Sequence, residues 1–152
     1  MQLEEGQLYA GGVSLTGDDG PYHDWIVVSP FGRMHLHSID DPLLLHCLPL
    51  NAAHRSLAAG GMRLVGSDPD HPVLQLQREK ERRGIQDSHL GLHGEDLQGM
   101  LELLEEAVAA RSPYAAYAAG EIRGLINTEL CSAHEVERAL ARVEAALASL
   151  PN

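Results

Sequence analysis

Apolar and polar residues alternate most clearly between residues 22 and 39, and this pattern predicts a β-hairpin. Residues 22–28 are rich in aromatic and β-branched side chains, and residues 33–39 return in the same way. A Ser-Pro-Phe-Gly sequence at residues 29–32 separates them, with proline and glycine at positions typical of a turn. The hairpin is therefore expected to be part of an antiparallel sheet.

Further apolar segments of the first half are expected to extend this sheet. Residues 43–48 are almost continuously apolar, as in a central strand covered on both faces, and Cys47 is then a small buried hydrophobic residue. Asn51 is expected to cap a short helix at residues 52–59. The remaining predicted strands are residues 7–16 with a glycine bend, residues 62–65 and residues 73–76.

The second half of the chain has a helical period. After an expected loop at residues 84–94, a first helix has an apolar face formed by Leu97, Leu101, Leu104 and Val108. Ser112-Pro113 is expected to start a second helix, which Gly120 ends. A Ser132–Glu135 capping box starts the last helix. Its apolar seam comprises Val136, Leu140, Val143, Leu147 and Leu150.

This order of elements predicts an α+β fold, with an antiparallel sheet of about five to six strands followed by C-terminal helices. Residues 1–152 are expected to form a single domain, strand-rich over 7–80 and helical over 95–150.

The charge balance restricts the expected partners. The chain has 22 acidic and 11 basic side chains, a formal net charge of −11. A protein that follows nucleic-acid phosphates needs a basic face, so direct nucleic-acid binding is not expected. The basic run at residues 78–83 alternates with glutamates, which is typical of a solvated strand end or loop.

Two cysteines provide no disulfide framework, and no segment has the pattern of a signal peptide. No apolar run reaches the length of about 18 residues that a membrane span requires. The chain is therefore expected in the cytoplasm, without membrane association.

Histidines are the main candidates for chemistry, since the chain has nine. His35 and His37 are expected on one strand face, about 7 Å apart, because side chains alternate along a strand. His89 and His93 have the i, i+4 spacing with which two histidines bind one zinc ion. Asp24 lies opposite His37 if the hairpin loop has four residues, but not if it has three residues and a bulge. The other interpretation of His35 and His37 is that of half-exposed polar positions, and we expect no metal there.

Other catalytic patterns are not found in the sequence. Neighbouring strand residues such as His46 and Cys47 point to opposite faces and cannot pair directly. No serine has a Gly-x-Ser-x-Gly setting, and no glycine pattern for nucleotide phosphates is present. No catalytic residue and no cofactor is therefore predicted.

The stretch from residue 43 to residue 111 carries a family resemblance. A Leu-Pro-Leu-Asn entry at residues 48–51, a short helix, the segments 60–65 and 73–77 and an acidic amphipathic helix occur in that order. Over residues 22–111 the chain resembles the type III secretion chaperone-like fold and its YbjN-type relatives. The resemblance implies a small acidic bacterial homodimer that binds other proteins rather than catalysing a reaction. Residues 1–21 lack the opening helix of that family, and residues 112–152 add helical sequence.

The expected function is thus that of a non-enzymatic protein-binding module, chaperone-like or regulatory, acting as a small acidic homodimer. A second subunit is expected to cover the sheet face that the helices leave open. The alternative is a small metal-binding protein or metal-dependent hydrolase that uses His35 and His37 with His89 or His93.

Overall fold

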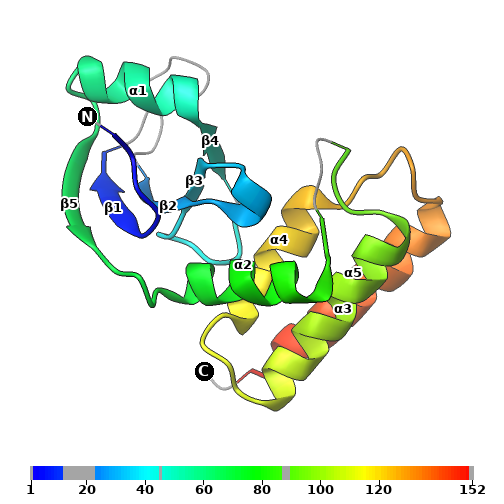
Figure 1. Cartoon of the computed structure of the whole chain (residues 1–152). Coiled ribbons are helices and arrows are strands. Elements are labelled where there is room, and N and C mark those ends of the chain that lie inside the picture. Colours follow the sequence, from blue (N-terminus) through cyan, green and yellow to red (C-terminus); the bar gives the residue numbers. More distant parts are fainter. Residues whose placement is uncertain (1, 12–22, 45, 87–89, 151–152) are drawn as a thin grey trace. The chain divides into compact units, whose positions relative to one another are not determined.

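The protein has an antiparallel sheet followed by most of its helices, which confirms the predicted α+β class (Figure 1). The structure is a computed structural model and describes residues 2–11, 23–44, 46–86 and 90–150. Over these residues, five strands lie in the order β4-β3-β2-β1-β5. They are β1 (Gln7–Ala10), β2 (Asp24–Val28), β3 (His35–Ser38), β4 (Cys47–Pro49) and β5 (Arg63–Ser67).

The helices of the described residues include one inside the sheet region and four that follow it. They are α1 (Leu50–Ala58), α2 (Pro72–Arg83), α3 (Gly94–Ala109), α4 (Ala115–Leu125) and α5 (Ala133–Ala148), with a 3-10 turn, η1 (Pro30–Gly32), in the hairpin. None of the described helices combines the length and apolar character needed to cross a membrane.

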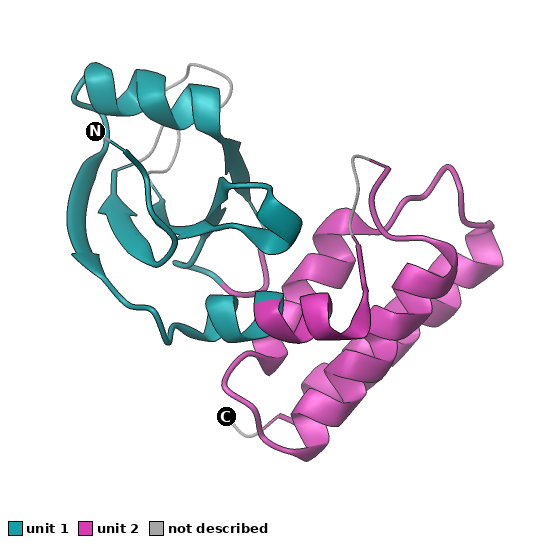
Figure 2. Ribbon diagram, in the orientation of Figure 1, with its two compact units in different colours: residues 1–41, 46–77 teal, residues 42–45, 78–152 magenta. Residues whose placement is uncertain are grey.

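The chain forms two compact units (Figure 2). The first, residues 1–41 and 46–77, contains the whole sheet and α1. The second, residues 42–45 and 78–152, contains α3, α4 and α5. Helix α2 contributes residues to both units, because the boundary at residues 77 and 78 falls within it.

The first unit is built around one face of the sheet. Val27 pairs with Leu36, and Leu36 pairs with Leu48, so these three side chains lie on the same face. They belong to a core completed by Leu3, Tyr9, Trp25, Ala53 and Met62. The opposite face also holds buried residues, Ile26, Val28 and His37. Since both faces carry buried side chains within one chain, an open sheet face is not a reason for dimerisation.

The prediction of a central strand at residues 43–48 is wrong. The strand β4 begins at Cys47 and lies at one end of the sheet order, and Cys47 is exposed rather than buried. Residues 42–45 belong to the second unit, where the backbone of Pro42 and Leu43 lies against Gly120 of α4. The apolar run therefore contributes to packing as a connection and not as a strand.

The predicted strand at residues 73–76 is instead the start of α2. Val73, Leu76 and Lys80 are all buried and are spaced by three and four residues, the period of a helix face. Pro72 occupies the first helical position, where its missing N–H is not needed. A short segment with three apolar residues out of four does not distinguish a strand from a buried helix. The basic residues 78–83 consequently lie in the later turns of this helix.

The three predicted leucines of α3 are buried, whereas the seam predicted for α5 is buried only in part. Leu97, Leu101 and Leu104 of α3 are buried, and Val143 of α5 is fully buried between the buried Ala139 and Ala146. Helix α5 packs against α3 and α4. Of its predicted seam only Val143 is buried, while Val136, Leu140, Leu147 and Leu150 are half-buried. The Ser132–Glu135 capping box is confirmed, because the Ser132 hydroxyl accepts from the Glu135 N–H and the Glu135 carboxylate accepts from the Ser132 N–H.

Two predictions for α4 are wrong. The helix begins at Ala115, and Ser112 accepts from the Ala115 N–H through its carbonyl rather than capping with its hydroxyl. Gly120 does not end the helix but lies buried within it. A Cβ atom at this position would be 2.0 Å from the carbonyl oxygen of Pro42, so glycine allows two backbones to approach closely.

Gly120→Ala should therefore destabilise the chain even though alanine is the better helix former. The alanine methyl group has no space beside the Pro42 carbonyl, and overpacking of this kind costs roughly 1–3 kcal/mol. Urea unfolding followed by circular dichroism measures the change. Gly124→Ala, at an exposed position of the same helix, is the matched control and should stabilise by about 0.5–1 kcal/mol. Equal stability changes in both variants would contradict this packing role for Gly120.

Candidate functional site

His35 and His37 lie on one face of β3, as predicted. Nδ1 of His37 donates to the Ser38 carbonyl at 2.8 Å, and Nδ1 of His35 donates to the Arg33 carbonyl at 3.1 Å. His37 is buried, whereas His35 is half-buried. His37 pairs with Ile26, so Asp24 does not lie opposite it, and the Asp24 carbonyl accepts instead from the Ile39 N–H.

The other two predicted histidines do not complete a metal centre with them. His93 precedes α3 in an extended conformation, and its buried Nδ1 atom has no hydrogen-bond partner in the described part of the chain. His89 lies outside the described residues. Among the residues that the structure describes, no group of three or more His, Cys, Asp or Glu side chains is arranged to hold a metal ion.

A different pair of histidines lies together in the first unit. The rings of His23 and His46 have centroids 4.5 Å apart and are tilted by 30°. Nδ1 of His23 donates to a carboxylate oxygen of Asp40 at 2.8 Å. Trp25 stands edge-on to His23, with ring centroids 5.5 Å apart. Because 22 residues separate the two histidines in the sequence, no local spacing indicated this cluster.

His71 has a structural role at the start of α2. Its Nδ1 atom accepts a hydrogen bond from the Val73 N–H at 3.1 Å, which satisfies one of the donors that a helix start leaves unpaired. Burial lowers the pKa of His71 from its ordinary value of 6.5, His37 lowers it further, and the Asp68 carboxylate opposes the shift. The neutral ring is therefore the form that fits the folded chain.

The basic residues at the end of α2 are paired with acids. Arg82 and Arg83 both bind Glu79, and Arg83 also binds Glu106. The hydrogen bonds from Arg82 and then Arg83 lower the pKa of Glu79 from 4.5 to about 2. This run is therefore largely neutralised by neighbouring carboxylates rather than presented as a basic face.

The second unit contains a fully buried ion pair. Nζ of Lys80 in α2 lies 3.0 Å from a carboxylate oxygen of Glu121 in α4, and the two side chains are 1% and 2% exposed. Burying two charges costs several kcal/mol per ion unless each meets a partner. The pair therefore fixes the position of α2 against α4 in this unit.

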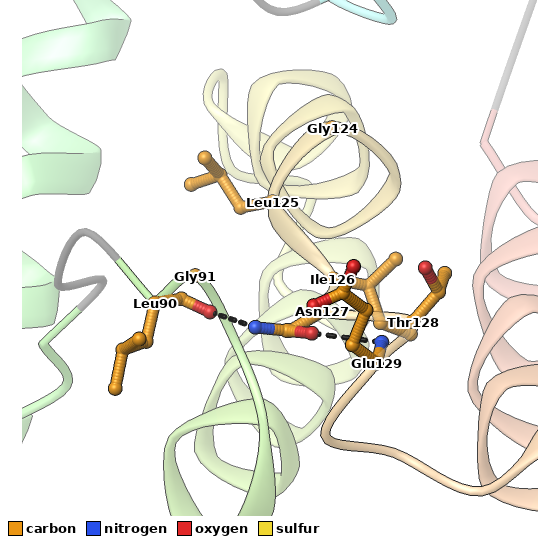
Figure 3. A pocket seen from close by; sticks show the side chains of 8 residues that line it. All are labelled: Leu90, Gly91, Gly124, Leu125, Ile126, Asn127, Thr128 and Glu129. Atoms are coloured by element: carbon orange, nitrogen blue, oxygen red, sulfur yellow. Dashed lines mark hydrogen bonds between the residues drawn. The ribbon is translucent and has the colours of Figure 1, made fainter.

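A cavity of about 490 Å³ lies beside Asn127 in the second unit (Figure 3). Nδ2 of Asn127 donates to the Leu90 carbonyl, and its Oδ1 accepts from the N–H groups of Glu129 and Leu130. The amide is thus used to join two loops. The lining residues are Leu90, Gly91, Gly124, Leu125, Ile126, Asn127, Thr128 and Glu129. Among the described residues of this lining, the side chains of Asn127, Thr128 and Glu129 are polar, and Glu129 is the single carboxylate.

The strand β5 has the most exposed surface of the sheet. All five of its residues are exposed, and Leu64 and Val65 remain 45% and 55% accessible. It pairs with β1 and stands at the end of the strand order, so its other edge is open within the described sheet. The pairing with β1 shifts register at Val65, which has no partner residue. We name this open strand edge, residues 63–67, the β5 edge.

Comparisons with models of known protein families, with curated proteins and with solved structures give no match for this chain.

The lowered pKa of His71 should make the free energy of unfolding depend on pH. The unfolded chain binds a proton on this histidine near pH 6.5, whereas the folded chain binds it only at lower pH. Stability is therefore complete above pH 6.5 and is lost as the pH falls through the lowered pKa. His71→Asn should flatten this part of the profile, because asparagine also caps a helix but does not titrate.

Urea unfolding between pH 8 and pH 5 measures this profile for both proteins. At pH 8 the Asn variant should be about as stable as the wild type, whereas His71→Ala should lose about 1 kcal/mol through loss of the cap. An Asn variant with the same acid sensitivity as the wild type would refute the role of His71.

The buried ion pair also predicts that substitutions of Lys80 and Glu121 have non-additive effects on the free energy of unfolding. Lys80→Met leaves the Glu121 carboxylate buried without its cation, and such a loss costs roughly 3–5 kcal/mol. The double variant Lys80→Met, Glu121→Leu removes both charges and should recover most of that stability. Urea unfolding of the two variants at neutral pH checks this. A double variant as unstable as the single one would contradict the ion-pair interpretation.

Proposed function

We propose that this chain is a non-enzymatic protein-binding module, chaperone-like or regulatory, that holds an extended segment of another protein along the β5 edge. The observation that supports this is the exposure of every residue of β5 at the end of the sheet order. An open strand edge presents N–H and C=O groups in a row, and an added strand satisfies them by backbone hydrogen bonds. This mode of recognition needs no catalytic residue and no cofactor.

The side chains of β5 favour an apolar strand as the occupant. Leu64 and Val65 expose aliphatic surface, and burial of such surface is worth about 25 cal/mol per Å². Arg63 is the single charged residue of the strand, whereas the whole chain has a net charge of −11. The β5 edge itself therefore contains no acidic residue. An acidic partner is repelled less at this edge than at the acidic parts of the chain.

The same edge provides a route to a homodimer. When no partner segment is bound, β5 of a second copy is the strand available to cover it, in an antiparallel and symmetric pairing. The shift of register at Val65 and the charge of Arg63 both weaken edge pairing. The proposed dimer is therefore held reversibly, and a partner strand replaces the second copy.

Val65→Lys tests this proposal, because a charge on an exposed edge strand opposes pairing with another strand. The wild type should sediment as a dimer at tens of micromolar, and the variant should sediment as a folded monomer. The variant should keep its circular dichroism spectrum, since Val65 is 55% exposed.

Leu130→Lys is the matched control, because Leu130 is 53% exposed but lies in the second unit. It should leave the dimer intact. A dimer that survives Val65→Lys would exclude the β5 edge as the interface, and a monomeric wild type would exclude the homodimer.

A further inference from the structure

We propose that His23 and His46 together bind one transition-metal ion of the copper(II), nickel(II) or zinc(II) class. This inference uses the first unit's histidine cluster and is independent of the β5 edge. Both ligands come from that unit, His23 directly before β2 and His46 directly before β4. His46 is exposed and the His23 side chain is 17% accessible, so an ion can reach the pair from solvent.

The separation of the two rings suits a shared ion. Two imidazoles in adjacent positions around one metal, with metal–nitrogen distances of about 2.0–2.1 Å, place their ring centroids roughly 4.5–5 Å apart. The centroids of His23 and His46 are 4.5 Å apart. The separation of the two rings therefore lies within the range expected for two imidazoles on one ion.

Asp40 determines which tautomer of His23 is present. A carboxylate only accepts hydrogen bonds, so Nδ1 of His23 carries the proton in the 2.8 Å contact with Asp40. In the neutral ring, Nε2 then carries the lone pair that a metal requires. A carboxylate that orients a metal-binding histidine in this way also raises its basicity.

Two protein ligands leave the remaining coordination positions to water. The site therefore differs from a closed structural zinc site with four protein ligands. Copper(II) should bind most tightly among the divalent ions, because affinity at nitrogen sites rises from manganese to copper and falls at zinc.

The single tryptophan of the chain provides the experiment. Trp25 lies 5.5 Å from His23 between ring centroids, so a paramagnetic ion on that histidine should quench its fluorescence. Titration of the untagged, chelator-treated full chain with copper(II) should quench the emission with a stoichiometry of one. Zinc(II), which has a filled d shell, should compete and restore the emission.

Three variants locate the ion. Asp40→Asn should weaken copper binding roughly 10–100-fold, as expected for loss of an orienting carboxylate, and His46→Ala should weaken it more. His54→Ala, which removes an exposed histidine of α1, is the matched control and should bind like the wild type. The His46 side chain is exposed, and circular dichroism verifies that its variant is folded.

Quenching that is unchanged in His46→Ala and Asp40→Asn would show an adventitious ion only and would overturn the proposal. Absence of quenching at millimolar copper would do the same. Neither outcome affects sedimentation of the dimer, so failure of this site and failure of the protein-binding proposal remain distinguishable.

Discussion

The buried contact between Lys80 and Glu121 is the constraint on which the second unit depends. Each charge is almost completely removed from water, so neither side chain is tolerable there without an opposite charge close by. Lys80 reaches this position only because α2 is helical, since Val73 and Leu76 then share its buried face. Within the second unit, the pair thus holds the Lys80 end of α2 against α4.

The fold was predictable where the sequence signal is local and periodic. The Ser132–Glu135 box and the leucine face of α3 depend on residues three or four positions apart, and the structure contains them. The prediction failed where tertiary contacts decide. Residues 73–76 belong to a helix whose buried face ends in a lysine, and Gly120 is needed because of the distant Pro42 carbonyl rather than for a helix end. Neither requirement is visible in a short window of sequence.

The candidate sites were less predictable than the fold for the same reason. Strand periodicity placed His35 and His37 correctly on one face, but not their backbone acceptors, the Arg33 and Ser38 carbonyls. His23 and His46 meet only because β2 and β4 flank β3 in the sheet, and each histidine lies just before one of these strands. Sheet order depends on residues far apart in the sequence. A short sequence spacing, such as that between His89 and His93, therefore did not predict which histidines lie together.

The hydrogen bonds of each histidine determine which ring nitrogen carries the proton and which one can bind a metal. His71 uses its Nδ1 lone pair to accept from the Val73 N–H, so its neutral ring carries the proton on Nε2 and has no second lone pair for a metal. His37 donates from Nδ1 and keeps a lone pair on Nε2, but the side chain is buried. His23 combines the same tautomer with partial access to solvent and a second imidazole 4.5 Å away. Tautomer and exposure together, rather than the number of histidines, therefore favour the pair at His23 and His46 over the strand pair.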